Sequence, residues 1–433
     1  MSENPRFWGG LRLICGASDA IVIVGPTGSS AKTCGGQTYH SFFGFRHQYL
    51  PTHKDPVEEA AHLLKQPRWG PIKLRLARVR AILIDEVAMI SAQRLDIMRQ
   101  LIHLCQPWRS PACSFYPFGD FLQLRPPHGD LSFESTAWRQ LFRDDMLELT
   151  RVHRQNDGDF VAVIRDARFG LCTEGMANLM RERTVVGAAY AKIETTVLHL
   201  LSKHKDVWRR NNKCLLRINP VPRPHDFIAV DGVEEDPDRD PTISKPILSV
   251  VTAATRAAAL VECAAPMHVQ HCLNELVMMK SNSKISLGLF HGNIGTIVSY
   301  SSSGAPIVRF ENHRLPEKVA RGADGLLDAG KDWLVAEITP VSFKARVWSV
   351  PGVIVVRLQV PPVLGWAMTV HRSQSLTLSQ AVLDVGEAFE DCMVPTAFSR
   401  VSEKQRMCVK TFCGTRMRAD VAAVQFYRDG RRL

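Results

Sequence analysis

Two adjacent carboxylates, Asp85 and Glu86, directly follow the apolar run Ala81–Ile84. Such a run is typical of a buried strand, and ligands bind at the carboxyl ends of parallel strands in α/β sheets. Two acids at that edge can perform different tasks in the transfer of a phosphoryl group to water. Asp85 would hold Mg²⁺ through its water shell, and Glu86 would orient and deprotonate the attacking water. The alternative is a strand that ends in a solvated acidic turn.

A second candidate region begins at the apolar run Ala20–Val24 and turns through Gly25-Pro26-Thr27-Gly28. The stretch GPTGSSAKT looks like a phosphate loop, but its spacing fails. The pattern G-x-x-x-x-G-K-[ST] requires glycine at the positions that Pro26 and Ala31 occupy. We therefore exclude a nucleotide cradle in this turn.

The following segment, Gly35–Gly44, combines glycines, hydroxyl groups, a histidine and paired aromatic side chains. His40 and the hydroxyls can hydrogen-bond phosphates, and Phe42 can stack on an unpaired base. The segment is thus a candidate for binding single-stranded nucleic acid. The equally weighted alternative is a loop with a small aromatic cluster packed beneath it.

The composition restricts the class of partner. Lysine and arginine number 54 against 43 aspartates and glutamates, a net charge of +11 that favours polyanions, with nucleic acid first. The 11 cysteines include no C-x-x-C pair, which indicates reduced thiols in an intracellular setting. No apolar run is long enough to span a bilayer, and residues 1–10 have no secretory pattern, so we expect no membrane association.

Several stretches, taken in chain order, resemble the motifs of the Pif (petite integration frequency) DNA helicases, in the RecD-like branch of helicase superfamily one. Each stretch is ambiguous alone, because it could be no more than a Gly-Asp turn or a surface arginine. Together, however, the stretches follow the order of the family's motifs and extend over nearly the whole chain. Ser375 and Pro395 depart from the family pattern, in which glycine and tyrosine occupy these positions. Beside the Pro-Thr-Gly turn, the stretches are IDEVAMISAQRLD, GDFLQLRPP, LTRVHRQ, GWAMTVHRSQSLTL and TAFSRV.

The resemblance implies an α/β fold of two RecA-like parallel-sheet domains, of the P-loop NTPase type, with a small β-barrel insertion in the second. Residues 1–155 would form a truncated first core with a wedge insertion at 47–78. The second core would comprise 156–290 and 356–433, on either side of a β-rich, SH3-like insertion at 291–355.

The resemblance also implies roles for individual residues. Gln123 would sense the terminal phosphate, Arg154 would project towards it from between the two cores, and Arg400 would stabilise its charge from the second core. Gln374 would lie on the nucleotide side of the cleft. The residues implied to contact DNA are Pro26, Thr27, His40, Phe42, Thr369, His371 and Ser373.

These roles predict that ATP–Mg²⁺ hydrolysis drives movement along single-stranded DNA in the 5′ to 3′ direction and unwinds forked DNA. The expected setting is repair, recombination and telomere maintenance in the nucleus or mitochondrion, with no stable protein partner. In the family a phosphate loop precedes the Pro-Thr-Gly turn, yet none of the 24 residues before Gly25 reads G-K-[ST]. A second hypothesis therefore stays open: an impaired helicase or gene fragment that binds single-stranded nucleic acid without turnover.

Overall fold

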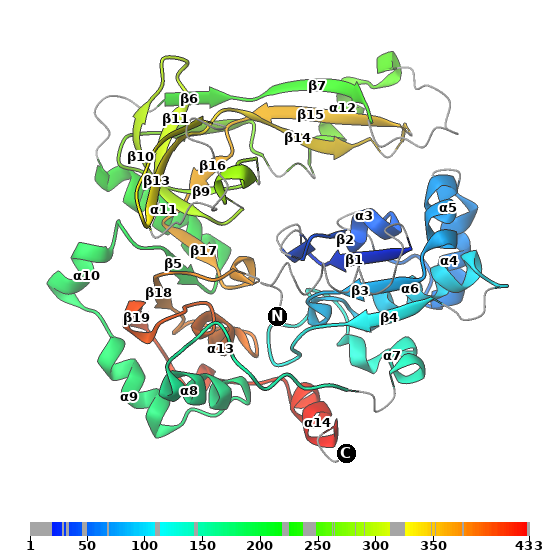
Figure 1. The fold of residues 1–433 in the computed structure, drawn as a ribbon, viewed down its shortest axis with the longest axis horizontal. Coiled ribbons are helices and arrows are strands. Elements are labelled where there is room, and N and C mark those ends of the chain that lie inside the picture. Colours follow the sequence, from blue (N-terminus) through cyan, green and yellow to red (C-terminus); the bar gives the residue numbers. More distant parts are fainter. Residues whose placement is uncertain are drawn as a thin grey trace.

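The computed structural model of the chain contains two parallel sheets and an antiparallel region that lies above both in the view of Figure 1. The structure describes residues 20–27, 30–31, 34–45, 50–66, 69–108, 113–142, 146–218, 225–236, 248–261, 263, 265–281, 283–289, 291–311, 325–347, 349–350, 352–374 and 376–430.

The first core is built on a parallel sheet with the strand order β2-β1-β3-β4. β1 and β3 pair in register from Ile21↔Ala81 to Val24↔Ile84, which brings the turns after both strands to one edge. β4 lies at the end of this sheet and therefore tolerates Pro117, whose missing N–H would weaken a central strand. The strands are β1 (Ile21–Gly25), β2 (Gln37–Thr38), β3 (Ala81–Ile84) and β4 (Ser114–Pro117).

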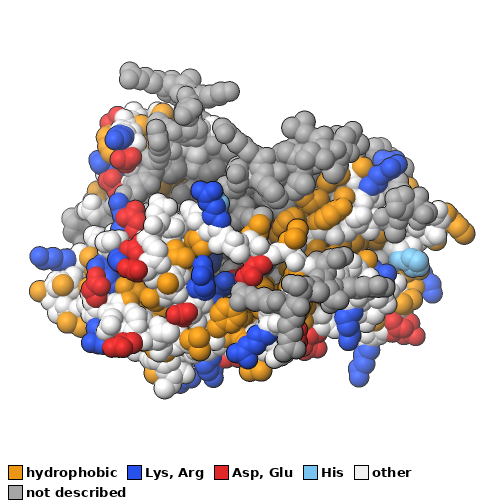
Figure 2. Space-filling model, turned by 60° about the horizontal axis from the view of Figure 1, so that its bottom comes forward, with side chains coloured by type: hydrophobic (Ala, Val, Ile, Leu, Met, Phe, Trp, Pro, Cys, Tyr) orange, Lys and Arg blue, Asp and Glu red, His pale blue; other side chains and the backbone are white. Residues whose placement is uncertain are grey.

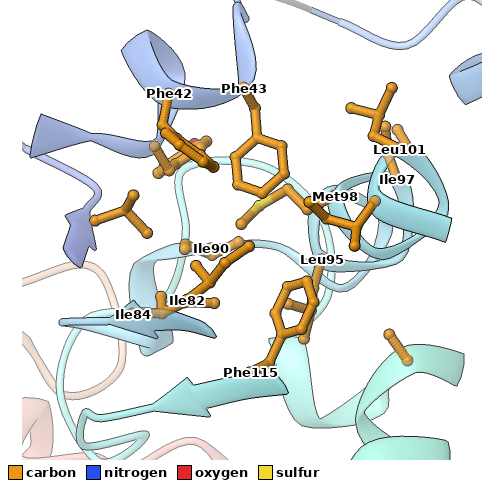
Figure 3. Packing of buried hydrophobic residues seen from close by; sticks show 14 of the residues in the cluster. Phe42, Phe43, Ile82, Ile84, Ile90, Leu95, Ile97, Met98, Leu101 and Phe115 are labelled. Carbon is orange, nitrogen blue, oxygen red and sulfur yellow. The ribbon is translucent and has the colours of Figure 1, made fainter. Parts of the chain in front are cut away.

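Helices bury the apolar face of this sheet. The segment predicted as a wedge insertion forms two helices, α4 and α5, which pack against α6 and bury Leu63, Trp69 and Leu76 in the cluster that includes β3. Figure 3 shows side chains of α3, β3, β4 and α6 meeting in this cluster. The elements are α3 (Tyr39–Phe43), α4 (Pro56–Lys65), α5 (Gly70–Arg78), η2 (Val87–Met89), α6 (Ala92–Cys105), η3 (Ser132–Glu134) and α7 (Thr136–Leu141).

The second core is a parallel sheet with the strand order β17-β5-β18-β19. Its strands are β5 (His199–Leu201), β17 (Ala367–Thr369), β18 (Ala381–Asp384) and β19 (Met407–Thr411). They pack with apolar side chains of α8 and α13 in a second buried cluster. The other elements of this part are α8 (Gly158–Arg168), α9 (Glu174–Arg183), α10 (Gly187–Ile193), α11 (His204–Ile218), η7 (His371–Ser373), α13 (Met393–Phe398), η8 (Lys404–Arg406) and η9 (Gly414–Arg416).

The antiparallel region is wider than the predicted insertion at 291–355. Its largest sheet has the order β12-β13-β11-β10-β9-β16, and smaller sheets pair β14-β15-β7 and β6-β8. Because β7 and β9 pair with strands far along the chain, the region runs from His225 to Leu364. Its elements are β6 (His225–Ile228), β7 (Val230–Glu235), η4 (Leu248–Val250), α12 (Ala253–Leu260), β8 (His268–His271), β9 (Leu276–Met279), η5 (Ile285–Leu287), β10 (Ile294–Tyr300), β11 (Pro306–Glu311), β12 (Leu326–Ala329), β13 (Trp333–Glu337), β14 (Val341–Arg346), β15 (Val353–Gln359) and β16 (Pro362–Leu364).

The C-terminal helix α14 (Val421–Gly430) returns to the first core, although its place within 356–433 predicts the second. The Phe426 ring stacks on Phe133 with centroids 4.4 Å apart and meets Trp138 edge-on at 5.9 Å. The buried Ala423 lies three residues earlier, on the same side of the helix. This apolar face corrects the prediction of a second-core segment and explains why the helix is held on the first core.

No helix in the described ranges combines the length and the apolar character that crossing a membrane requires.

Phe426→Ala tests the packing of α14. We expect the free energy of unfolding to fall by about 2–3 kcal/mol, because a partly buried ring leaves an aromatic cluster. Thermal and urea unfolding followed by tryptophan fluorescence measure the change. Val421→Ala is the matched control, since Val421 is 81% exposed on the same helix and should shift stability by less than about 0.5 kcal/mol. Wild-type stability of the Phe426 variant would show that α14 contributes nothing to the core.

Candidate active site

The turn after β1 is closed by its own side chains. A Cβ on Gly25 would lie 2.4 Å from Ser30 Oγ, so the turn requires glycine there. Thr27 Oγ1 accepts a hydrogen bond from Ser30 N at 3.1 Å, and Ser30 Oγ donates to Thr27 O at 3.2 Å. Pro26 and Thr27 are half-buried and lie at the carboxyl end of β1, next to the end of β3.

The aromatic segment that follows is part of the hydrophobic core. Phe42 is 3% exposed, contacts Phe43 edge-on at 5.1 Å and lies 5.2 Å beneath the Arg75 guanidinium. Its side chain points into the cluster of Figure 3 and is not available to stack on a base. The predicted contact of Phe42 with DNA is therefore wrong, and the packed aromatic cluster is the correct alternative. His40 is half-buried and stacks on Tyr39 with ring centroids 4.0 Å apart.

Asp85 and Glu86 lie between the ends of β1 and β4. Asp85 N donates to Val24 O at 2.8 Å, and Val87 N donates to Phe118 O at 2.9 Å. Glu86 has a φ of +50°, a left-handed conformation that is uncommon for a residue with a side chain. Backbone strain of this kind persists where the surrounding structure enforces it and clusters at functional sites.

The Asp85 carboxyl is buried and 4% exposed. Burial raises its pKa to about 7, and the charge of Glu86 adds to the shift. Among the described residues, Asp85 Oδ2 has no hydrogen-bond partner. A cation would satisfy this oxygen, and Mg²⁺ is usually bound through one or two carboxylates, water and substrate phosphates. Asp85 therefore fits the predicted Mg²⁺ role, although no group of three or more His, Cys, Asp or Glu in the described chain is arranged for a metal.

The loop that carries Gln123 packs against this acidic edge. A Cβ on Gly119 would lie 2.9 Å from Val87 N, so only glycine allows the loop to approach η2. Asp120 accepts hydrogen bonds from Leu122 N at 3.1 Å and from Gln123 Nε2 at 3.3 Å. The carboxylate thus fixes both the loop and the orientation of the predicted sensor.

Two distant elements hold Asp120 in turn. Arg168, at the end of α8, donates to both carboxylate oxygens, at 2.8 and 3.0 Å. Tyr427 of α14 donates to Asp120 Oδ1 at 3.3 Å, and its oxygen accepts a hydrogen bond from Phe121 N at 3.1 Å. Sequence reasoning missed both residues, because neither belongs to a motif and only the fold brings them to the loop.

The two predicted arginines meet at one turn of the second core. Arg154 Nη1 donates to Ser399 O at 3.0 Å, and Arg400 Nη2 donates to Ser399 Oγ at 2.7 Å. Arg400 is 1% exposed and also donates to Gln123 Oε1 across the cores at 3.4 Å. Gln155, which was not assigned a role, supports the turn by donating to Ser399 O at 3.3 Å. The structure thus brings Gln123, Arg154 and Arg400 together.

The motif from Gly365 to Leu378 exposes few of its polar side chains to solvent. Thr369 is 1% exposed and accepts from Arg372 N at 3.3 Å, while Ser373 is fully buried and donates to Val370 O at 2.7 Å. Both hydroxyls shape the turn, so their predicted direct contact with DNA phosphates is not supported in this conformation.

Two other predicted residues of this motif differ in exposure. Gln374 is buried at the end of η7. The His371 side chain is 37% exposed and lies 2.7 Å from a Glu390 carboxylate oxygen, so it remains a candidate for nucleic acid. Ser375, the departure from the family pattern, lies outside the described residues.

No family model matches the chain, but comparisons with known proteins find similar chains. The chain is 26% identical over 427 residues to "ATP-dependent DNA helicase PIF1" of Rattus norvegicus, a match that covers 95% of this chain and 58% of that protein. The protein of the same name from Homo sapiens is 25% identical over 425 residues, with 95% and 57% covered. The chain thus spans less than two thirds of the length of these relatives.

Solved structures show the same fold. The crystal structure of Pif1 helicase from Candida albicans matches with a TM-score of 0.73 and 21% identity, covering 98% of this chain and 92% of that one. Pif1 helicase from Bacteroides in complex with ADP-AlF3 and single-stranded DNA matches with a TM-score of 0.63 and 18% identity, covering 100% and 91%.

The parallel sheets, the polar contacts between them and the antiparallel region define a protein with two RecA-like cores. The ordered motifs and the relatives over 95% of the chain support a helicase of the Pif1 family.

Asp85→Asn tests the buried carboxyl. The pKa of Asp85 is about 7 in the folded chain and near 4 in the unfolded chain. Between these two pH values the unfolded chain loses its proton first, so ionisation destabilises the fold increasingly as the pH rises. In buffer without Mg²⁺ or nucleotide, we expect the stability advantage of Asp85→Asn to be larger at pH 8 than at pH 5, by on the order of 2 kcal/mol. Thermal unfolding at both values measures it, and exposed Asp332→Asn is the control. An advantage independent of pH would contradict the burial effect.

Proposed function

We propose that this chain carries the motor of an ATP-dependent DNA helicase that moves 5′ to 3′ on single-stranded DNA and unwinds forked duplexes. The observation that carries the proposal is the hydrogen bond from Arg400 to Gln123, which joins the two cores beside the acidic edge. Relatives along 95% of the chain are named ATP-dependent DNA helicases, which supports the same reaction here. Such a helicase would act in DNA repair, recombination and telomere maintenance, in the nucleus or mitochondrion.

The proposed roles follow from the chemistry of each side chain. Glu86 orients the attacking water and accepts its proton, and Asp85 binds Mg²⁺, which neutralises phosphate charge when present. Gln123 contacts the terminal phosphate from the first core. Arg154 and Arg400 contribute permanent positive charge from the second core, where a planar guanidinium can donate two hydrogen bonds to phosphate oxygens.

Single-stranded and forked DNA are the proposed nucleic-acid partners. Pro26 and Thr27 at the end of β1, His40 on α3 and His371 in η7 remain the candidates for contact with the strand. Solved family members include Pif1 of Bacteroides bound to single-stranded DNA and two Pif1 helicases at forked double-stranded DNA. The net charge of +11 supports a polyanionic partner for this chain as well.

One observation favours a second candidate function. The 433 residues contain no G-K-[ST], the pattern whose lysine and hydroxyl contact phosphates and Mg²⁺ in P-loop enzymes. This chain alone would then bind nucleotide weakly and act as a single-strand-binding protein without turnover.

An ATPase assay with and without single-stranded DNA separates the two functions. If the chain is a motor, DNA stimulates turnover, and Glu86→Gln lowers the rate at least about 100-fold while DNA affinity is retained, because the general base is lost. Glu58→Gln, at an exposed position on α4, is the control and keeps the wild-type rate. Salt-dependent DNA binding with no turnover supports the second function. Turnover that survives Glu86→Gln would refute the assigned base.

A further inference from the structure

Helix α11 turns an exposed apolar face to solvent. On its inner side, Asn211 accepts a hydrogen bond from Ala367 N at 2.9 Å, which holds the helix against β17. On its outer side, Trp208 is 70% exposed and Leu216 is 79% exposed. Two turns of helix separate them, so both lie on the same face. An indole so exposed has no packing role in the described structure.

A row of cations runs beside this apolar face. Lys205, Arg209, Lys213 and Arg217 recur every fourth residue, a rise of about 6 Å per step. The side chains of Arg209, Lys213 and Arg217 are 70%, 54% and 49% exposed. Lys213, Arg217 and the buried Arg210 share one carboxylate, that of Glu194, so the row keeps a surplus of positive charge.

Two hollows meet along this row. One, of about 500 Å³, has Trp208 and Leu216 as its apolar wall and Arg209, Lys213 and Arg217 at its rim. The other, of about 470 Å³, shares Arg209 and Lys213 and includes Ser202. Ser202 is 5% exposed, and its hydroxyl has no hydrogen-bond partner among the described residues. The carboxylates of the second hollow are each paired with a cation, in Asp206–Arg209, Asp384–Lys410 and Glu387–Lys203.

The row begins at the same sheet edge as the proposed DNA contact in η7. Thr369 at the end of β17 pairs with Leu201 at the end of β5, so the turns after both strands are neighbours. Burial, with the nearby charges of Arg372 and His371, lowers the pKa of His204, the first residue of α11. A single strand of nucleic acid that passes His371 therefore reaches the first cations of the row.

We propose that the outer face of α11 binds single-stranded nucleic acid as a continuation of the proposed DNA contact in η7, with Trp208 stacked on a base. The row from Lys205 to Arg217 neutralises phosphates, and the Ser202 hydroxyl donates to a phosphate oxygen. This inference rests on the proposed binding of single strands at His371 and the other candidate contacts. An acidic protein segment would also suit the charge, but the start of the row beside His371 favours a nucleic acid strand. In the view of Figure 2, basic side chains are interspersed with acidic and apolar ones.

Trp208→Ala tests the stacking contact, with fluorescence anisotropy of a labelled 24-nucleotide oligo(dT) at moderate salt. Loss of one base–aromatic contact is expected to weaken binding at least about fivefold, and Trp208→Phe should restore most of it because a phenyl ring still stacks. Trp108→Ala is the matched control, since Trp108 is 94% exposed on the first core and should leave affinity unchanged. Wild-type affinity of the Trp208→Ala chain would overturn the proposal.

The double variant Lys205→Gln/Arg209→Gln tests the phosphate contacts. Loss of two contacts should reduce the salt dependence, the slope of log affinity against log salt, by about 1.4 for a single strand. Arg181→Gln/Lys192→Gln makes the same charge change on α9 and α10 and should keep the wild-type slope. If the wild-type chain binds DNA and the Lys205→Gln/Arg209→Gln variant keeps the wild-type slope, the α11 site is refuted while the proposed function is not. No binding by the wild-type chain would refute the proposed function as well.

Discussion

The hydrogen bond between Arg400 and Gln123 is the contact on which the arrangement of the site depends, because it joins the two cores at the acidic edge. It is long, at 3.4 Å, and each partner is held by its own core. Thr396 O accepts from Arg400 Nε at 3.1 Å, and Asp120 orients Gln123. Polar contacts between domains exchange with water more readily than a packed apolar interface, and relative domain motion is then the default expectation. A phosphate entering between the two side chains could therefore replace this bond without disturbing either core.

The chain crosses between the cores twice, and both crossings end near Asp120. The first leads from the first core into α8, whose last residue, Arg168, binds Asp120 from the second core. The second returns through residues 412–420 to α14, where Tyr427 reaches the same carboxylate. A Cβ on Gly170, after α8, would lie 2.7 Å from Ala419 N, so the two crossings are packed against each other. The loop that carries Gln123 is thus connected to both crossings through Asp120. A change in the relative orientation of the cores would therefore alter the contacts of this loop.

Sequence reasoning predicts the strand ends better than it predicts the direction of side chains. The position of Asp85 and Glu86 follows from an apolar run and its end, both local features, and the meeting of Arg154 with Arg400 is implied only by the family resemblance. The burial of Phe42, Thr369 and Ser373 does not follow from such patterns. A hydroxyl or a ring within a motif suits a ligand and a packed turn equally well, and only the tertiary neighbours decide between them.

Long-range pairing was also beyond the reach of local patterns. β7 and β15 pair through Val230↔Leu358, residues that are distant in sequence, so the limits of the antiparallel region depend on contacts with no local signal. The same holds for α14, whose short apolar face fits either core until Phe133 and Trp138 are in place.

The acidic edge is maintained at a cost that the first core must offset. Asp85 is buried with a raised pKa, and Glu86 has a left-handed backbone, and both features oppose folding. They persist because β3 lies between β1 and β4, with Ile82 and Ile84 fully buried beneath the turn. Fully burying one such side chain stabilises a fold by about 1.5–3 kcal/mol, the same order as the cost of the strained pair. The aromatic cluster around Phe42 belongs to this same core, so its contribution to the site is to hold the carboxylates in place rather than to offer a ring for stacking.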